Sequence, residues 1–234
     1  MTIKMKYAAL FLTLGIALIV LGIKFGGLGW LLVWTGVSFV VVGAGYAGLG
    51  PRIFGKNQDG KIASWAIILL FPYLVGYWTR WYFLRLIQRE DCANEIVPGI
   101  WVGRRALADE LPENISLIVD FAAEIPEEPE VIANRSYIYL PSLDATVPED
   151  RIFKDIVKKV FDWDGNVYIH CAFGHGRSVA FAAAVLMTRG LADNVEQAEE
   201  IIKKVRPRVK LSQVQKNLLN RVIPSIQSDL KSAN

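Results

Sequence analysis

The sequence predicts an α/β domain with a mostly parallel sheet and helices on both faces, preceded by transmembrane helices. Two observations carry this prediction. The first 90 residues hold 9 Lys or Arg but only 2 Asp or Glu, whereas the remaining 144 hold 17 and 21. In this second part, short apolar runs alternate with helical patterns, an order typical of a parallel sheet. With 53% hydrophobic residues, the chain is neither disordered nor a basic nucleic-acid-binding tail.

The N-terminal part begins with two stretches that carry no charge, residues 7–23 and 25–51, separated by Lys24. At a rise of about 1.5 Å per residue, the first stretch spans roughly 25 Å, near the lower limit for a hydrocarbon core of about 30 Å. We therefore expect residues 1–61 to form a two-helix transmembrane hairpin. A cleaved signal peptide is the alternative, but no small-x-small site directly follows the first run.

A third apolar run, residues 62–79, is interrupted by Pro72 and Gly76 and followed by several arginines. Lys and Arg flank the outer ends of the hairpin, which predicts that both ends face the cytoplasm. A third crossing would carry the arginines to the opposite side. Because the run is also rich in Trp and Tyr, residues 62–90 are expected to form an amphipathic or re-entrant membrane-associated helix. The multi-pass membrane protein would then hold its last domain in the cytoplasm.

Residues 91–234 are numerous enough for one domain with its own core. Apolar runs bounded by turn residues predict strands at 99–103, 117–121, 136–140 and 167–170. Helical periodicity, with Gly or Pro after several of the runs, predicts helices at 106–111, 149–161, 177–189, 195–205 and 212–223. The acidic run 124–130, broken by two prolines, is interpreted as a solvated loop.

The most informative stretch joins the last predicted strand to the next helix: His170-Cys171-Ala172-Phe173-Gly174-His175-Gly176-Arg177-Ser178. Cys171 lies just before a helix N-terminus, where unpaired N–H groups and the helix dipole favour a thiolate. Gly174 and Gly176 permit backbone angles that let successive N–H groups converge on a tetrahedral oxyanion. Arg177 can offer two parallel donors to phosphate oxygens, which lysine cannot. The stretch predicts a nucleophilic cysteine in a phosphate-binding loop.

Two other interpretations of this stretch stay open. His170, Cys171 and His175 could be metal ligands, but neighbouring strand residues point to opposite faces, and no second Cys/His cluster completes a site. Cys171 could also be an inert buried cysteine. Neither interpretation accounts for the two loop glycines together with Arg177, so we expect no metal and no cofactor. Cys92 and Cys171 form no CxxC pair and require no oxidising compartment.

This stretch resembles the signature loop of the cysteine-based protein tyrosine phosphatases, His-Cys-x5-Arg followed by Ser or Thr. Residues 96–103, residues 117–120 and Arg206-Pro207 are similar to the dual-specificity branch, and the resemblance covers about residues 95–223. It implies a metal-independent hydrolysis of phosphate monoesters with Cys171 as nucleophile. It also implies that Arg177 and the loop residues Ala172, Phe173, Gly174, His175 and Gly176 bind the phosphate. Ser178 would stabilise the departing thiolate, and His170 would orient the loop through backbone hydrogen bonds.

In that family a loop aspartate protonates the leaving oxygen, and the resemblance assigns this role to Asp144, in the segment 140–148. Asp144 could instead be a turn residue that precedes a helix. Asp150 is the second candidate for the acid, although it lies inside the following predicted helix.

The resemblance leaves two kinds of substrate: phosphorylated proteins, which we favour, and lipid or inositol headgroup phosphates in the membrane. Lipid-cleaving members usually carry Lys or additional Arg inside the loop, whereas here only His175 could add charge, which favours a monophosphate. A non-enzymatic phosphate-binding relative would normally have lost Cys, Arg or Asp, and all three are present. No nucleic-acid partner is expected. One interpretation of the basic residues is a face toward an anionic membrane, formed by Arg80, Arg85, Arg89, Lys203, Lys204, Arg206, Arg208 and Lys210. The alternative is that the cluster 203–210 is a solvated helix end, because acidic residues one to two turns earlier partly cancel its charge.

Overall fold

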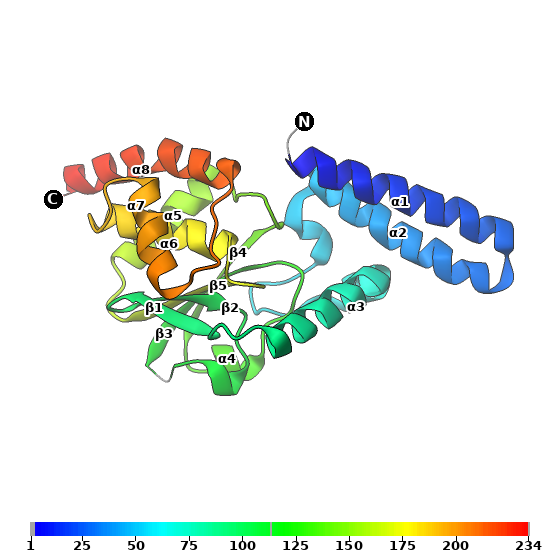
Figure 1. Ribbon diagram of the computed structural model, residues 1–234, viewed down its shortest axis with the longest axis horizontal. Coiled ribbons are helices and arrows are strands. Elements are labelled where there is room, and N and C mark those ends of the chain that lie inside the picture. The colour runs from blue at the N-terminus through cyan, green and yellow to red at the C-terminus, as the bar shows by residue number, and fades with distance from the viewer. Residues whose placement is uncertain (1–2, 113, 234) are drawn as a thin grey trace. The chain divides into compact units, whose positions relative to one another are not determined.

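The computed structural model describes residues 3–112 and 114–233 of the chain (Figure 1). The chain divides into two compact units. The N-terminal unit comprises Met1–Gln88 together with Ala123–Pro126, and the C-terminal unit comprises Arg89–Ala122 and Glu127–Asn234. The expected subdivision of the first 90 residues into a hairpin and a separate membrane-associated segment stays a prediction.

The N-terminal unit opens with two helices, α1 (Ile3–Phe25) and α2 (Trp30–Ala44), which are joined by the short turn η1 (Gly27–Gly29). Glycines lie where the helices touch: a Cβ atom on Gly15 would lie 2.7 Å from the carbonyl oxygen of Gly36. Small residues at such crossings allow the close backbone approach typical of membrane helix pairs. Among the described residues, two segments are long and apolar enough to cross a membrane, Ile3–Phe25 and Gly27–Phe54.

The second of these segments continues beyond α2 as η2 (Gly45–Leu49) and η3 (Gly50–Phe54). After a short loop, α3 (Ser64–Ile87) follows and includes Pro72 within its length. This helix is longer than the apolar run that predicted it, because it extends past Arg80 and Arg85. The indole of Trp34 donates a hydrogen bond to the carbonyl oxygen of Ile68 (3.0 Å), which joins α2 to α3.

The C-terminal unit is built on a five-stranded sheet in the order β1-β2-β5-β3-β4. Only β1 and β2 are antiparallel; β2 with β5, β5 with β3, and β3 with β4 are parallel, which confirms the predicted mostly parallel sheet. The strands are β1 (Ala93–Val97), β2 (Ile100–Arg104), β3 (Ile115–Ala122), β4 (Ser136–Ser142) and β5 (Asn166–Cys171). The first strand was not predicted, because ANEIV has neither an apolar run nor a clear alternation.

Four helices cover one face of this sheet (Figure 1): α5 (Asp150–Phe161), α6 (Arg177–Thr188), α7 (Val195–Val205) and α8 (Gln213–Ala233). Every residue of α6 is buried, so this helix forms the centre of the core on that side. A smaller cluster that includes Ile118, Tyr168 and Val131 covers the other face, and α4 (Pro129–Ile132) contributes to it.

Three local predictions are wrong. The helix expected at 106–111 is only the turn η4 (Ala108–Glu110), in which the Glu110 carboxylate accepts a hydrogen bond from Leu107 N–H (2.9 Å). The helix expected to end before Pro224 continues to Ala233, because Ile226 beyond the proline is fully buried and its packing offsets the lost backbone bond. The acidic run 124–130 is not simply solvated, since Glu124 and Glu127 are buried.

Candidate active site

The stretch singled out in the sequence forms the tight connection between β5 and α6. Cys171 is the last residue of β5, Arg177 is the first residue of α6, and we call residues 171–177 the phosphate loop. Gly174 has a φ of +75°, and a Cβ atom there would lie 2.6 Å from the backbone nitrogen of Arg104, so glycine is required. Gly176 differs from the expectation of a positive φ, because its φ is −135°.

The thiol of Cys171 is buried at the centre of this loop. Its sulfur lies 3.5 Å from the Ser178 hydroxyl and accepts a hydrogen bond from Gly174 N–H (3.3 Å). Burial alone would raise the pKa of Cys171, but the charge of Arg177 and the hydrogen bonds from Ser178 and Gly174 outweigh it and lower the pKa. Burial instead raises the pKa of Cys92 to about 11. The two free cysteines therefore differ in kind, and Cys171 is the one suited to act as a nucleophile.

Arg177 is held rigidly at the base of the loop and is only 3% exposed. Its Nη1 atom donates to the carbonyl oxygens of Phe121 (3.2 Å) and Ser142 (2.7 Å), which lie in β3 and β4. These two bonds fix the plane of the guanidinium and therefore the direction of its other donors. Three neighbouring parallel strands thus help to place the cysteine and the arginine at one edge of the sheet.

Asp144 follows β4 and lies beside the same arginine, with its carboxylate 3.8 Å from Arg177 Nε. A tight turn positions it, because Thr146 donates both its N–H (3.1 Å) and its hydroxyl (2.8 Å) to the carbonyl oxygen of Leu143. The Asp144 side chain is 57% exposed and so remains accessible to a substrate.

Asp150, the second candidate for the acid, is engaged elsewhere. Its two carboxylate oxygens accept hydrogen bonds from Arg221 on α8 (2.5 and 2.7 Å), and these bonds lower the pKa of Asp150. A general acid needs a raised pKa, so the structure gives no support to Asp150 in this role.

His170 points away from Cys171, as the alternation of a strand requires, and is fully buried. Its Nε2 atom lies 3.1 Å from a Glu127 carboxylate oxygen, and its Nδ1 atom lies 3.8 Å from Asp120. Glu127 also pairs with Arg105 (3.6 Å), and Asp120 accepts a hydrogen bond from the Tyr137 hydroxyl (2.6 Å). These buried carboxylates were not predicted, because the acidic run that contains Glu127 was interpreted as a solvated loop.

Asp120, Glu127 and His170 place possible metal-ligand atoms within 4.8 Å of one another. Arg105 already balances the charge of Glu127, and both oxygens of Asp120 accept protein hydrogen bonds, from Ala122 N–H and the Tyr137 hydroxyl. The cluster is therefore an ion network behind the loop. The other metal-ligand set considered from the sequence was His170, Cys171 and His175. In the structure these three side chains contact different residues: His170 contacts Glu127, Cys171 contacts Ser178 and His175 contacts Glu90.

His175, on the outer side of the loop, pairs with Glu90, whose carboxylate lies 2.5 Å from its Nε2 atom. Glu90 also contacts Arg206 (3.2 Å), and Arg206 donates to the carbonyl oxygen of Gly174 (3.3 Å). Arg206 is 1% exposed, which corrects its assignment to a basic membrane-facing surface. Neither Glu90 nor a buried Arg206 was predicted as part of the site.

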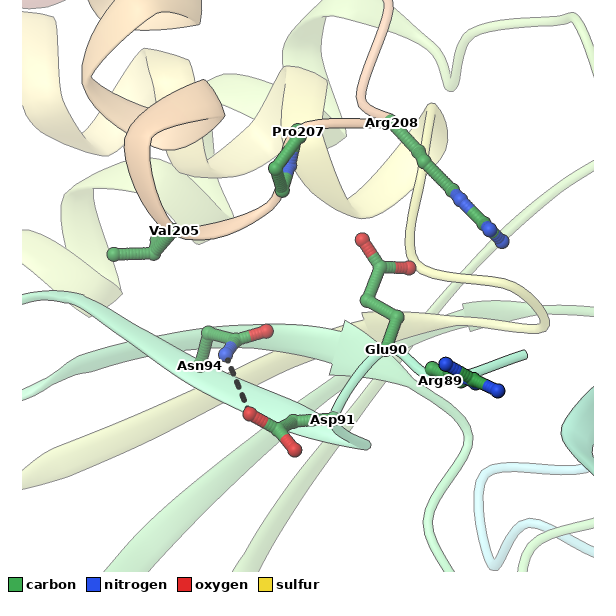
Figure 2. Close-up of a pocket in the computed structure, with 7 residues that line it drawn as sticks. All are labelled: Arg89, Glu90, Asp91, Asn94, Val205, Pro207 and Arg208. Atoms are coloured by element: carbon green, nitrogen blue, oxygen red, sulfur yellow. Dashed lines mark hydrogen bonds between the residues drawn. The ribbon is translucent and has the colours of Figure 1, made fainter.

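A pocket of about 300 Å³ adjoins this group (Figure 2). It is lined by Arg89, Glu90, Asp91, Asn94, Val205, Pro207 and Arg208. Figure 2 shows the Glu90 side chain directed toward the segment that carries Pro207 and Arg208.

Solved structures similar to this chain are cysteine-based phosphatases, and the α/β fold is that of their dual-specificity branch. PTPMT1 in complex with PI(5)P matches with a TM-score of 0.54 and 20% identity, covering 60% of this chain and 99% of that chain. DUSP15 matches with a TM-score of 0.52, 20% identity and coverage of 62% and 97%. Tk-PTP in its active form matches with a TM-score of 0.51, 24% identity and coverage of 57% and 97%. No protein-family model and no curated protein sequence matches the chain.

Proposed function

We propose that this protein is a membrane-anchored, cysteine-dependent phosphatase that hydrolyses phosphate monoesters. The observation that carries the proposal is the Cys171 thiol, whose pKa is lowered by Arg177, Ser178 and Gly174 inside a loop that leads into a helix N-terminus. Such a loop suits a tetrahedral oxyanion, because backbone N–H groups and a fixed guanidinium converge on one place. The fold shared with PTPMT1 and DUSP15 supports the same reaction class.

The proposed reaction has two steps. In the first, the Cys171 sulfur forms a bond to phosphorus while the bond to the ester oxygen breaks, and Asp144 gives its proton to that oxygen. In the second, water attacks phosphorus and gives a proton to the Asp144 carboxylate, and the sulfur–phosphorus bond breaks to release phosphate. Ser178, at 3.5 Å from the sulfur, stabilises the thiolate that departs in this step. The ion network around His170 supports the strand end that carries Cys171.

Phosphorylated tyrosine, serine or threonine in proteins is the substrate class that we favour. The loop contains one basic side chain between Cys171 and Arg177, and that residue, His175, is paired with Glu90. Additional phosphates on a substrate would therefore meet little positive charge within the loop. A phospholipid or inositol headgroup phosphate is the second candidate, supported by the two segments that are apolar enough to cross a membrane and by the fold shared with PTPMT1, solved in complex with PI(5)P.

The anchoring part of the proposal assigns Ile3–Phe25 and Gly27–Phe54 to membrane spans and the C-terminal unit to the cytoplasm. The excess of Lys and Arg in the first 90 residues, at the outer ends of these spans, supports that orientation. Protease treatment of sealed membrane vesicles of known orientation tests it. Protease added on the cytoplasmic side should cleave the C-terminal unit, and resistance of the unit to that protease would contradict the assignment.

The decisive test of the activity uses the purified full-length protein in detergent. We expect hydrolysis of p-nitrophenyl phosphate and of phosphotyrosine peptides, and no hydrolysis by the Cys171→Ser variant, since a serine hydroxyl is not ionised in this environment. Faster turnover of short-chain lipid phosphates than of the peptides would favour the second substrate class. Failure to hydrolyse any of the three would refute the phosphatase proposal.

A further inference from the structure

Glu90 has no place in the reaction described above, yet it contacts the phosphate loop directly. It lies between the end of α3 at Ile87 and the start of β1 at Ala93, and its side chain is only 12% exposed. One carboxylate oxygen meets two partners, Nε2 of His175 (2.5 Å) and Nη2 of Arg206 (3.2 Å). A single carboxylate thus links the loop to the segment that follows α7.

The charge of Glu90 makes this link strong. Burial would raise the pKa of Glu90, but the hydrogen bond with His175 and the charges of Arg206, His175 and Arg208 outweigh it and lower the pKa. An ionised carboxylate has only acceptors, so Nε2 of His175 must carry a proton and donate it. Both contacts are therefore charge-assisted hydrogen bonds, which are stronger than hydrogen bonds between neutral groups.

Two peptide units of the loop are held from outside, one by Arg206 and the other by the backbone of Lys210. Arg206 Nε donates to the carbonyl oxygen of Gly174 (3.3 Å), and the N–H of Lys210 donates to the carbonyl oxygen of His175 (3.3 Å). In a planar trans peptide, the C=O and the next N–H point in opposite directions. With these two oxygens held on the outer side, the N–H groups of His175 and Gly176 are turned toward the interior of the loop.

Arg206 is itself fixed by several acceptors. Its Nη1 atom donates to the Asn94 side chain (2.6 Å) and to the carbonyl oxygen of Asp91 (3.1 Å). Because Arg206 is 1% exposed, loss of its carboxylate partner would leave a buried guanidinium without its counter-charge. The guanidinium would then be expected to shift, and its bond to Gly174 with it.

We infer that Glu90 is a positioning residue for phosphate binding: through His175 and Arg206 it holds the loop so that the N–H groups of His175 and Gly176 face the substrate phosphate. This inference rests on the proposed function, because it assigns Glu90 to the same phosphate site. Glu90 takes no part in bond making or breaking. Its removal should therefore weaken the binding of phosphate itself.

The test compares full-length proteins in detergent: the parent, Glu90→Gln, His175→Asn and the double variant. Glu95→Gln is the matched control, because Glu95 is exposed, lies five residues away and accepts a hydrogen bond only from Gly99 N–H among the contacts known for it. We expect Glu90→Gln to raise the inhibition constant of inorganic phosphate and to lower kcat/KM for p-nitrophenyl phosphate, each by about tenfold or more. The control should match the parent.

The double variant distinguishes a positioning role of Glu90 from a general loss of stability, because it measures whether the effects of Glu90 and His175 depend on each other. If Glu90 acts through His175, the double variant should lose much less than the product of the two single losses. Multiplicative losses, or a lowered Tm with an unchanged phosphate inhibition constant, would overturn the inference. If Glu90→Gln does not fold, His175→Asn alone must raise the inhibition constant of inorganic phosphate. An unchanged inhibition constant in His175→Asn would then overturn the inference.

If the parent protein hydrolyses no substrate, the proposed function is refuted, but the role of Glu90 in phosphate binding is not yet decided. In that case, protection of Cys171 from iodoacetamide by inorganic phosphate measures binding without catalysis. Weaker protection in Glu90→Gln than in Glu95→Gln would support the inference, and equal protection would overturn it.

Discussion

Replacing Arg177 by lysine keeps the positive charge beside Cys171 but removes the planar fork. In the structure, Nη1 is bonded to the carbonyl oxygens of Phe121 and Ser142, so the guanidinium plane cannot rotate. A lysine ammonium is a flexible point charge and cannot make these bonds while also offering two parallel donors to phosphate. Two charge-assisted hydrogen bonds are worth about 3–6 kcal/mol together. At about 1.4 kcal/mol per factor of ten, kcat/KM should fall by about 10²–10⁴.

The assay is hydrolysis of p-nitrophenyl phosphate by the full-length protein, with thermal unfolding of each variant measured in parallel. Arg189→Lys is the matched control, because Arg189 directly follows α6 at its far end and donates to the carbonyl oxygen of Val160 (3.1 Å). The control should keep the parent's kcat/KM. A loss of less than tenfold in Arg177→Lys, with the fold intact, would refute the argument that the fork binds the transferred phosphate.

The other predictions concern the remaining groups of the site. Asp144→Asn should slow the hydrolysis of phenyl phosphate far more than that of p-nitrophenyl phosphate, whose product leaves without a proton; equal losses would move the acid role to another residue. The rate of Cys171 alkylation should rise with a midpoint below the usual thiol pKa of about 8.5, since the pKa of Cys171 is lowered. Ser178→Ala should move this profile to higher pH, and an unmoved profile would contradict the role of the hydroxyl. Gly174→Ala should lower Tm, because its Cβ atom would overlap backbone at 2.6 Å; an unchanged Tm would show that the loop can relax.

The sequence predicts local structure best where the necessary residues are consecutive. The phosphate loop combines a strand, a Gly174 with positive φ and a helix start within nine residues, and each of these has a local signal. The parallel sheet was likewise predictable, because the order of apolar runs and helical patterns follows from the chain alone. Asp144 needed more, since its role as the acid was inferred only from the resemblance to a known family.

The errors have a common physical origin in tertiary contacts. Pro224 ends a helix by local rules, but the packing of Ile226 carries α8 past it. Arg206 belongs to a basic stretch that predicts exposure, yet it is buried because Glu90 and Asn94 supply acceptors for its guanidinium. Glu90 and Arg206 are 116 residues apart in the chain, and no spacing or periodicity relates them.

The position of Glu90 also bears on where the C-terminal unit begins. Residue 91 is the natural boundary by composition, because the chain changes from basic and apolar to acidic at that point. The C-terminal unit nevertheless begins at Arg89, and the carboxylate that contacts His175 and Arg206 comes from Glu90. A soluble fragment that starts at residue 91 would lack this carboxylate and leave Arg206 with one acceptor fewer. If such a fragment were less active on a substrate presented in vesicles, two causes would be combined, the lost N-terminal helices and the disturbed phosphate loop. Only a fragment that starts at Arg89 or earlier can separate them.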